Sequence, residues 1–185
     1  MALTPDDTGI ITASPHGSTV EWALADGRIR RLLGTKPTVT AVAVDPSQTR
    51  LAIGASEGGV RVIDYDSGRP LSELPGVSGK LSAAAFPTKD TLLYGLENGE
   101  IGLWNLGADK AVYRRPKAHS NSLTGFSVPR SGLFVSSDTA RWIHQWDLAT
   151  GTKTRSRLAH GSAVFGVGLT PDGQRILTGG HDRKL

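Results

Sequence analysis

Apolar residues fall into short runs of about five to eight residues, separated by Gly, Pro, Asp, Asn and Ser. No run repeats its apolar residues every three or four positions over a helical length, so the pattern predicts strands throughout. The clearest set is a succession of four strands between residues 39 and 74. Their expected bounds are Val39–Val44, Arg50–Ala55, Val60–Tyr65 and Pro70–Leu74.

The same succession of four strands recurs along the chain. The strands that open each set are expected near Ala2, Val39, Leu81, Leu123 and Val164. The repeat units therefore span about residues 1–34, 35–76, 77–118, 119–159 and 160–185, and the last unit is incomplete. Such a regular interval is typical of repeat architectures.

Prolines that close an apolar run give an independent measure of the interval. Their spacings are 41, 41, 42 and 42 residues, at Pro5, Pro46, Pro87, Pro129 and Pro171. The stretch Ile143–Gly151 likewise has a counterpart 42 residues earlier, at Ile101–Gly107. Two unrelated markers thus agree on one repeat length.

A polarity gradient within each unit indicates how its strands are arranged. Opening strands such as Val39–Val44 are nearly continuous apolar runs, as expected for strands covered on both faces. Closing strands such as Lys153–Leu158 carry charges that protect an exposed sheet edge. Radial packing of like units would cover the faces that one unit cannot bury alone. The sequence predicts an all-β propeller with about four complete four-stranded blades and a partial fifth.

The composition excludes the kinds of site that depend on cysteine. Apolar residues make up 38% and charged residues 21% of the chain, which is typical of a globular protein, and there is no cysteine. Disulfides, zinc knuckles and a thiol nucleophile are therefore excluded. The N-terminus has no basic region followed by an apolar run, and no stretch is long enough to cross a bilayer, so we expect a cytoplasmic protein with no membrane partner.

The net charge of +4 could attract nucleic acid, but the basic residues are dispersed and recur with the repeat. No aromatic platform interleaves with them, so a solvated outer face is expected and nucleic acid is not expected as a partner. These residues are Arg28, Arg30, Arg31, Arg114, Arg115, Lys117, Lys153, Arg155 and Arg157.

The repeat length and the Trp146-Asp147 dipeptide resemble the WD-repeat family, whose units of about 40 to 45 residues pair a Gly-His turn with a later Trp-Asp. The Arg- and Ala-rich units look like those of bacterial members, in which such arrays are often attached to regulatory domains. By this resemblance we expect an open fragment of a larger, seven-bladed ring, because the interval places the next tryptophan at position 188, beyond Leu185.

The resemblance also implies a buried network in each unit: a His before the inner strand, a Ser or Thr on the second, an Asp before the third and a Trp on the third. The fourth unit has His119, Ser136 and Trp146, with Ala140 in place of the Asp, and the fifth has His160, Thr178 and Asp182. The third unit keeps only Trp104, and the second has none of these residues. Trp104 and Trp146 are expected to be buried against the next blade.

Other patterns could suggest chemistry. His119 and His160, with Asp147 and Asp182, resemble metal ligands, but the two histidines occupy equivalent positions in successive repeats and should lie on neighbouring blades. Ser120 beside His119 does not make a catalytic triad, which needs converging geometry. We expect no catalytic residue, cofactor or metal.

Trp142 is the candidate for partner binding. It occupies a turn position where other units carry Gly59 and Glu100, and by the resemblance these turns line a face that receives protein partners. Tryptophan is enriched in binding hot spots. Packing of Trp142 against the neighbouring blade is an equally good alternative. The other residues expected on this face are Arg141, Glu57, Asn98 and His16.

Two functions remain open. The first is a non-enzymatic interaction scaffold or regulatory domain, whose partners are other proteins or other domains of the parent chain. The second is an enzymatic or ligand-binding propeller with a site over the central channel. The turns that would supply such a site carry side chains of unrelated charge and chemistry, which do not form a catalytic or metal-binding set. They are His16, Glu57, Asn98, Arg141 and Asp182. Fold alone does not decide between them.

Overall fold

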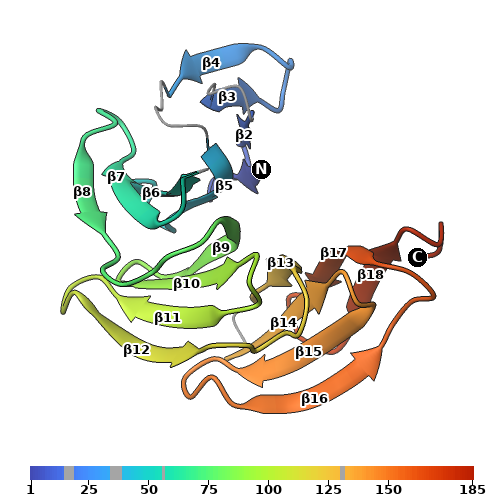
Figure 1. Cartoon of the computed structure of the whole chain (residues 1–185). Helices are drawn as coiled ribbons and strands as arrows, with labels where there is room; N and C mark the ends of the chain where they lie inside the picture. The colour runs from blue at the N-terminus through green and yellow to red at the C-terminus, as the bar shows by residue number, and fades with distance from the viewer. Residues whose placement is uncertain (15–18, 34–38, 56, 130–131) are drawn as a thin grey trace.

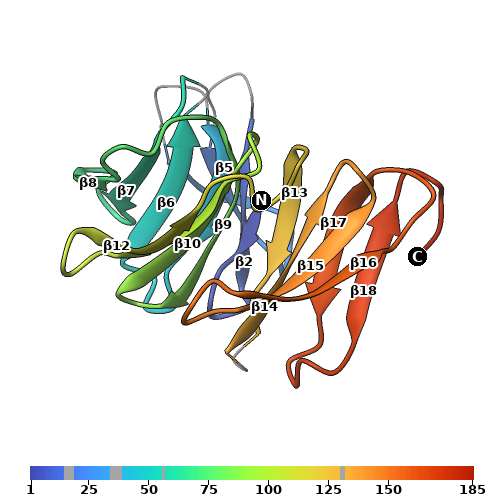
Figure 2. The same cartoon turned by 60° about the horizontal axis from the view of Figure 1, so that its bottom comes forward.

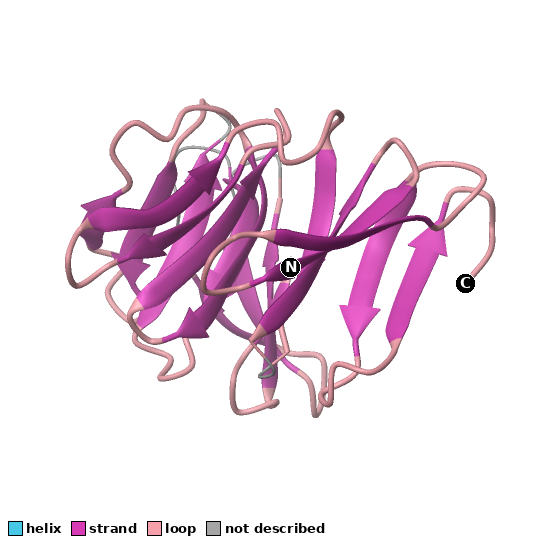
Figure 3. Ribbon diagram, turned by 90° about the horizontal axis from the view of Figure 1, so that it is seen from below, coloured by secondary structure: helices cyan, strands magenta, loops and turns pink. Residues whose placement is uncertain are grey.

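The computed structural model describes residues 1–14, 19–33, 39–55, 57–129 and 132–185. Every regular element in these ranges is a β-strand (Figure 3). Within the same ranges, no helix is long and apolar enough to span a membrane. The predicted all-β class is confirmed.

In the described part of the chain, eighteen strands form five antiparallel sheets in which neighbours follow the order of the sequence. The first sheet holds β1 (Ala2–Leu3), β2 (Gly9–Ala13), β3 (Thr19–Ala23) and β4 (Ile29–Leu32); the second holds β5 (Val39–Val44), β6 (Arg50–Ala55), β7 (Val60–Asp64) and β8 (Pro70–Glu73). The third holds β9 (Leu81–Thr88), β10 (Thr91–Leu96), β11 (Ile101–Asn105) and β12 (Lys110–Arg115). The fourth holds β13 (Leu123–Ser127), β14 (Leu133–Asp138), β15 (Trp142–Asp147) and β16 (Lys153–Leu158), and the fifth holds β17 (Val164–Leu169) and β18 (Ile176–Gly180).

The sheets follow one another along an arc, with the first strand of each sheet on the inside (Figures 1 and 2). The inner strands β5, β9, β13 and β17 contact one another in succession. The closing strand β16 is exposed along its whole length. This is the predicted propeller arrangement, with four complete blades and a two-stranded fifth, and the polarity gradient correctly placed the apolar strands innermost.

Apolar clusters between adjacent sheets hold the blades together, and they correct one expectation. Trp104 packs with residues of the second sheet, and Trp146 packs with residues of the third. Each tryptophan therefore faces the preceding blade and not the next one. Alternate residues of a strand point to opposite faces, and Leu103 beside Trp104 takes the face toward the fourth sheet. Both faces of the strand are apolar, so its pattern of residues does not indicate which neighbouring blade each face meets.

Several strand boundaries differ from the expected ones by one or two residues; β7 and β8, for example, end one residue early, at Asp64 and Glu73. β9 continues through Pro87 to Thr88, where its register with β10 shifts between Thr91 and Leu93. Proline has no N–H to donate, so it is accommodated at such an irregularity. Trp142, expected in a turn, is instead the first residue of β15 and pairs with Leu158 of β16.

Candidate functional site

A continuous chain of hydrogen bonds crosses the fourth sheet. Trp146 Nε1 donates to Ser136 Oγ at 2.7 Å, and Ser136 Oγ lies 2.6 Å from His119 Nε2. His119 Nδ1 lies 2.8 Å from Asp138 Oδ2. The Asp138 carboxylate can only accept, so His119 Nδ1 carries the hydrogen and donates to it. In the neutral imidazole Nε2 is then the acceptor, and the Ser136 hydroxyl donates to it while its oxygen accepts from Trp146. All four side chains are buried.

Asp138 is the acid of this network, which corrects the assignment of that place to Ala140. β14 runs to Asp138, and alternation puts Asp138 on the same face as Ser136. Its second oxygen, Oδ1, accepts the backbone N–H of Trp142 at 2.9 Å. The carboxylate therefore orients His119 and fixes the start of β15, although the repeat interval points to a residue two positions later.

The fifth sheet has the equivalent arrangement at the positions that the resemblance implies. His160 Nδ1 lies 2.9 Å from Asp182 Oδ1, and His160 Nε2 lies 2.9 Å from Thr178 Oγ1. In the first sheet, Trp22 Nε1 donates to Thr12 Oγ1 at 2.8 Å, as Trp146 does to Ser136. The network thus recurs in part at both ends of the arc.

The third sheet uses different residues in the same region. Tyr94 donates to Glu100 Oε1 at 3.0 Å, and Arg114 Nε donates to the same oxygen at 2.8 Å. Burial raises the pKa of Tyr94, and the Glu100 charge adds to that effect. Trp104 Nε1 donates to Asp109 at 3.4 Å, a longer contact than that of Trp146. An ion pair therefore replaces the histidine-centred network here.

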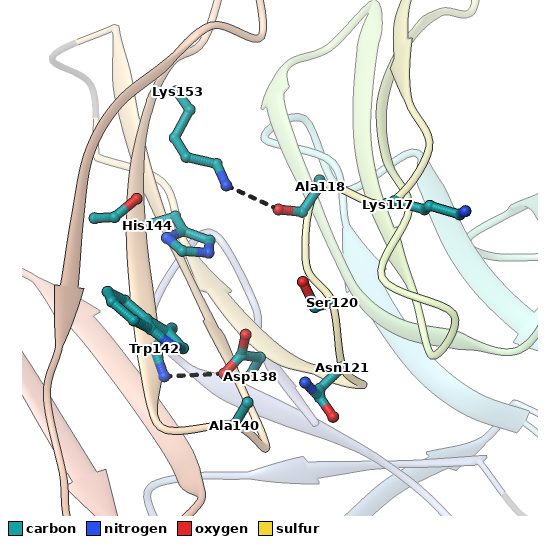
Figure 4. Close-up of a pocket in the computed structure, with 10 residues that line it drawn as sticks. Lys117, Ala118, Ser120, Asn121, Asp138, Ala140, Trp142, His144 and Lys153 are labelled. Atoms are coloured by element: carbon teal, nitrogen blue, oxygen red, sulfur yellow. Dashed lines mark hydrogen bonds between the residues drawn. The ribbon is translucent and has the colours of Figure 1, made fainter.

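Beside the fourth-sheet network lies a cavity of about 360 Å³, between that sheet and the loop that joins β12 to β13. Figure 4 shows Trp142 and His144 on one side of it and Ser120 and Asn121 on the other, with Lys153 pointing in from above. The Trp142 ring is stacked on His144, with centroids 6.0 Å apart, and the Trp142 residue is 39% exposed. It therefore packs within its own sheet while one face remains open to solvent.

His144 was not singled out by the sequence, although alternation in Trp142-Ile143-His144-Gln145-Trp146 places it on the face of both tryptophans. The residue is 8% exposed, and Nδ1 has no hydrogen-bond partner. Burial, with smaller contributions from the charges of nearby His119 and Lys153, lowers the pKa of His144 to about 4. Burial also lowers the pKa of His119, against the opposing effect of Asp138.

Ligand atoms of His119, Asp138 and His144 lie within 4.8 Å of one another, a grouping that could hold a metal ion. Both nitrogens of His119 and both oxygens of Asp138 are already engaged in hydrogen bonds. Only His144 contributes a nitrogen without a partner. The Lys153 ammonium in the same cavity also opposes a cation. The arrangement is that of a structural network, and His160 belongs to the separate network of the fifth sheet.

The depressed histidine pKa values predict acid-sensitive folding. Below pH 6.5 the unfolded chain binds protons that folded His119 and His144 do not, and for His144 this difference extends down to about pH 4, so stability should fall as pH falls below 6.5. The free energy of unfolding should change with pH by at most about 1.4 kcal/mol per pH unit for each histidine. Urea denaturation at pH 7.5, 6, 5 and 4.5 would measure it. His144→Gln should flatten the slope, and an unchanged slope would contradict this account.

Three of the residues expected on the partner face lie in loops between the second and third strands of their sheets. Arg141, Asn98 and Glu57 are all exposed, and His16 lies outside the described residues. Arg141 has a φ of 77°, whereas the equivalent position in the third sheet is Gly99, with a φ of 82°. Each residue belongs to its own blade, so the structure places them at corresponding positions without bringing them together. Trp142 is the one that lines the cavity.

A second cavity, of about 440 Å³, lies among the inner strands. It is lined by Met1 and by residues of β5, β9, β13 and β17, such as Thr40, Ser82, Thr124 and Phe165. None of the described residues around it has an ionisable side chain. The general acid, general base or metal ligand that hydrolysis would need is therefore missing from this lining.

The family described as "WD domain, G-beta repeat" matches residues 151–185. U3 small nucleolar RNA-associated protein 4 from Saccharomyces cerevisiae is 27% identical over 91% of this chain, and Transducin beta-like protein 3 from Mus musculus is 30% identical over 83%. These matches support membership of the WD40-repeat family. The chain spans 24% and 20% of the length of these two relatives.

A solved structure titled "Structure of U3-55K" superposes on the WD40 repeats with a TM-score of 0.77, over 90% of this chain and 53% of the other. At 18% identity this likeness shows the fold alone. The two relatives come from a yeast and a mouse, and they give no support to a bacterial type of WD40 repeat.

Proposed function

We propose that this WD40-repeat chain is a non-enzymatic interaction module that binds another protein, or another domain of its parent chain, through the surface around Trp142. The observation that carries the proposal is a partly exposed tryptophan beside a cavity of about 360 Å³. Aromatic residues at the edge of a pocket are the usual anchors of protein interfaces. The relatives support a WD40-repeat assignment, and the choice of this surface rests on geometry.

Backbone strain at Arg141 supports the same surface. A non-glycine residue in the left-handed region costs on the order of 1 kcal/mol, and such strain is often retained at functional positions. Arg141 and Arg183 adopt φ values of 77° and 60° at equivalent positions, where Gly58 and Gly99 stand in the second and third sheets. An exposed guanidinium next to Trp142 is a second residue type common in binding hot spots.

A catalytic site over the central channel is the weaker alternative, because the described residues that line the inner cavity lack ionisable side chains. Calorimetric titration with Zn²⁺, Mn²⁺ and Mg²⁺ would test it. We expect no saturable heat, and a stoichiometric binding isotherm would favour a metal-dependent site instead.

Nucleic acid is not part of the proposal, although the printed name of the yeast relative refers to a small nucleolar RNA. Several basic side chains are occupied within the fold: Arg31 pairs with Glu21, Arg114 pairs with Glu100, and Arg115 donates to backbone carbonyls of the next sheet. A cytoplasmic location remains a prediction from the sequence.

Trp142→Ala should weaken the capture of protein partners at least tenfold and change the melting temperature by less than about 2 °C, because the ring is partly exposed. Affinity capture followed by quantitative mass spectrometry would measure the first effect, and calorimetry the second. Leu71→Ala is the control, since this apolar residue is 54% exposed but lies on β8 of the second sheet, away from both cavities. Equal loss of capture in both variants would contradict the proposed surface.

A further inference from the structure

We propose that the cavity beside Trp142 binds the carboxylate of an aspartate or glutamate side chain in the partner protein. This inference rests on the proposed function, because it names the partner chemistry that the Trp142 surface would recognise. It follows from one cation with unused hydrogen-bond donors, one buried ring nitrogen without a hydrogen-bond partner, and the side chains that face the open part of the cavity.

The cation is Lys153, at the start of β16. Its Nζ donates to the carbonyl oxygen of Ala118 at 3.1 Å and lies 5.0 Å from the centre of the Trp146 ring. Among the described residues, no carboxylate lies within 4.0 Å of this amine. An ammonium group has three donors, so two remain available for an incoming acceptor. Figure 4 shows the amine directed into the cavity.

His144 supplies the second observation. Its ring lines the same cavity, and Nδ1 is buried with no hydrogen-bond partner. A neutral imidazole carries one N–H. Nδ1 has no acceptor within reach, so we place the hydrogen on Nε2. From there it could be donated to an acceptor atom of a bound partner. A carboxylate, which accepts through two oxygens, could bond to Lys153 and to His144 together.

The free hydrogen-bond donors of the cavity, and not its net charge, favour a carboxylate. Asp138 lies on the wall and keeps its negative charge, but its oxygens accept hydrogen bonds from His119 and from the backbone of Trp142, and neither lies within 4.0 Å of the Lys153 amine. Lys153 is the basic residue that points into the space, whereas the side chain of Lys117 points away from it (Figure 4). Phosphorylated segments are usually recognised by clusters of arginine, which this cavity lacks. A carboxylate therefore matches it better than a phosphate, and the Trp142 ring can cover the methylene groups of the same side chain.

A random peptide display library selected on the whole chain would provide the probe. We expect the peptides that require Trp142 to share an Asp or Glu at one fixed position. For a fluorescein-labelled selected peptide, Lys153→Met and replacement of that acid by its amide should each weaken binding at least tenfold. The two changes combined should weaken it little more than either alone, because they remove the same pair. Lys153→Arg should retain most of the affinity, and Lys117→Met should change it less than twofold.

The outcomes separate this inference from the function on which it rests. Peptides that require Trp142 but share no acidic residue, or that bind Lys153→Met as well as the natural chain, would overturn the carboxylate site and leave the interaction surface standing. Failure to select any peptide that requires Trp142 would overturn the surface itself, and the inference with it. Melting temperatures of all variants would show that Lys153→Met is folded, and Lys153→Arg tests the charge without losing the contact to Ala118.

Discussion

Replacing Trp146 by alanine should lower the free energy of unfolding by about 3 to 5 kcal/mol, the range for large aromatic truncations in a core. The indole is buried between the third and fourth sheets and stacks on Phe134, with ring centroids 5.9 Å apart. It also donates to Ser136, the hydroxyl that orients His119. The substitution would leave a cavity and remove the first donor of the network. Urea denaturation followed by circular dichroism would measure the change.

Trp142→Ala is the matched control for this measurement. Both tryptophans lie on β15 and face the same side of the sheet, but Trp142 is 39% exposed. Its loss should cost less than about 1 kcal/mol. If Trp146→Ala also cost less than about 1 kcal/mol, the interface between the two blades would not be the one described.

Asp138→Ala should lower the free energy of unfolding by about 2 to 4 kcal/mol, because hydrogen bonds to a charged group contribute more than neutral ones and the buried donors would be left unpaired. The donors concerned are His119 Nδ1 and the backbone N–H of Trp142. Chemical denaturation at pH 7.5 would measure the loss where both histidines are neutral.

Ala140→Asp in the Asp138→Ala background distinguishes the observed network from the one that the repeat interval implies. Position 140 lies in the turn after β14, beyond the last residue that shares the face of Ser136. The second substitution should therefore restore less than half of the lost stability. Full recovery would show that the acid of this network belongs at position 140 after all.

The repeat interval by itself determines the architecture. Regular spacing of Pro46, Pro87 and Pro129 fixed the units, and the contrast between the apolar Val39–Val44 and the charged Lys153–Leu158 fixed which strands lie inside. These features are local, since each strand carries the period and polarity of its own environment. The resemblance to WD repeats implies one shared network for His160, Thr178 and Asp182, and the structure joins all three.

The tertiary structure alone decided the details of the fourth sheet. The interval pointed to Ala140, but the length of β14 placed Asp138 beside His119. The Trp142 ring stacks on His144, and both residues form one wall of the cavity. The loop between β12 and β13 forms the opposite wall, and Lys153 points into the space between them. Which face of a sheet meets which neighbour depends on strand ends, twist and loop conformation across more than one repeat. A one-residue change in any of these moves a side chain to the other face, so the sequence determined the blades, and their packing determined the site.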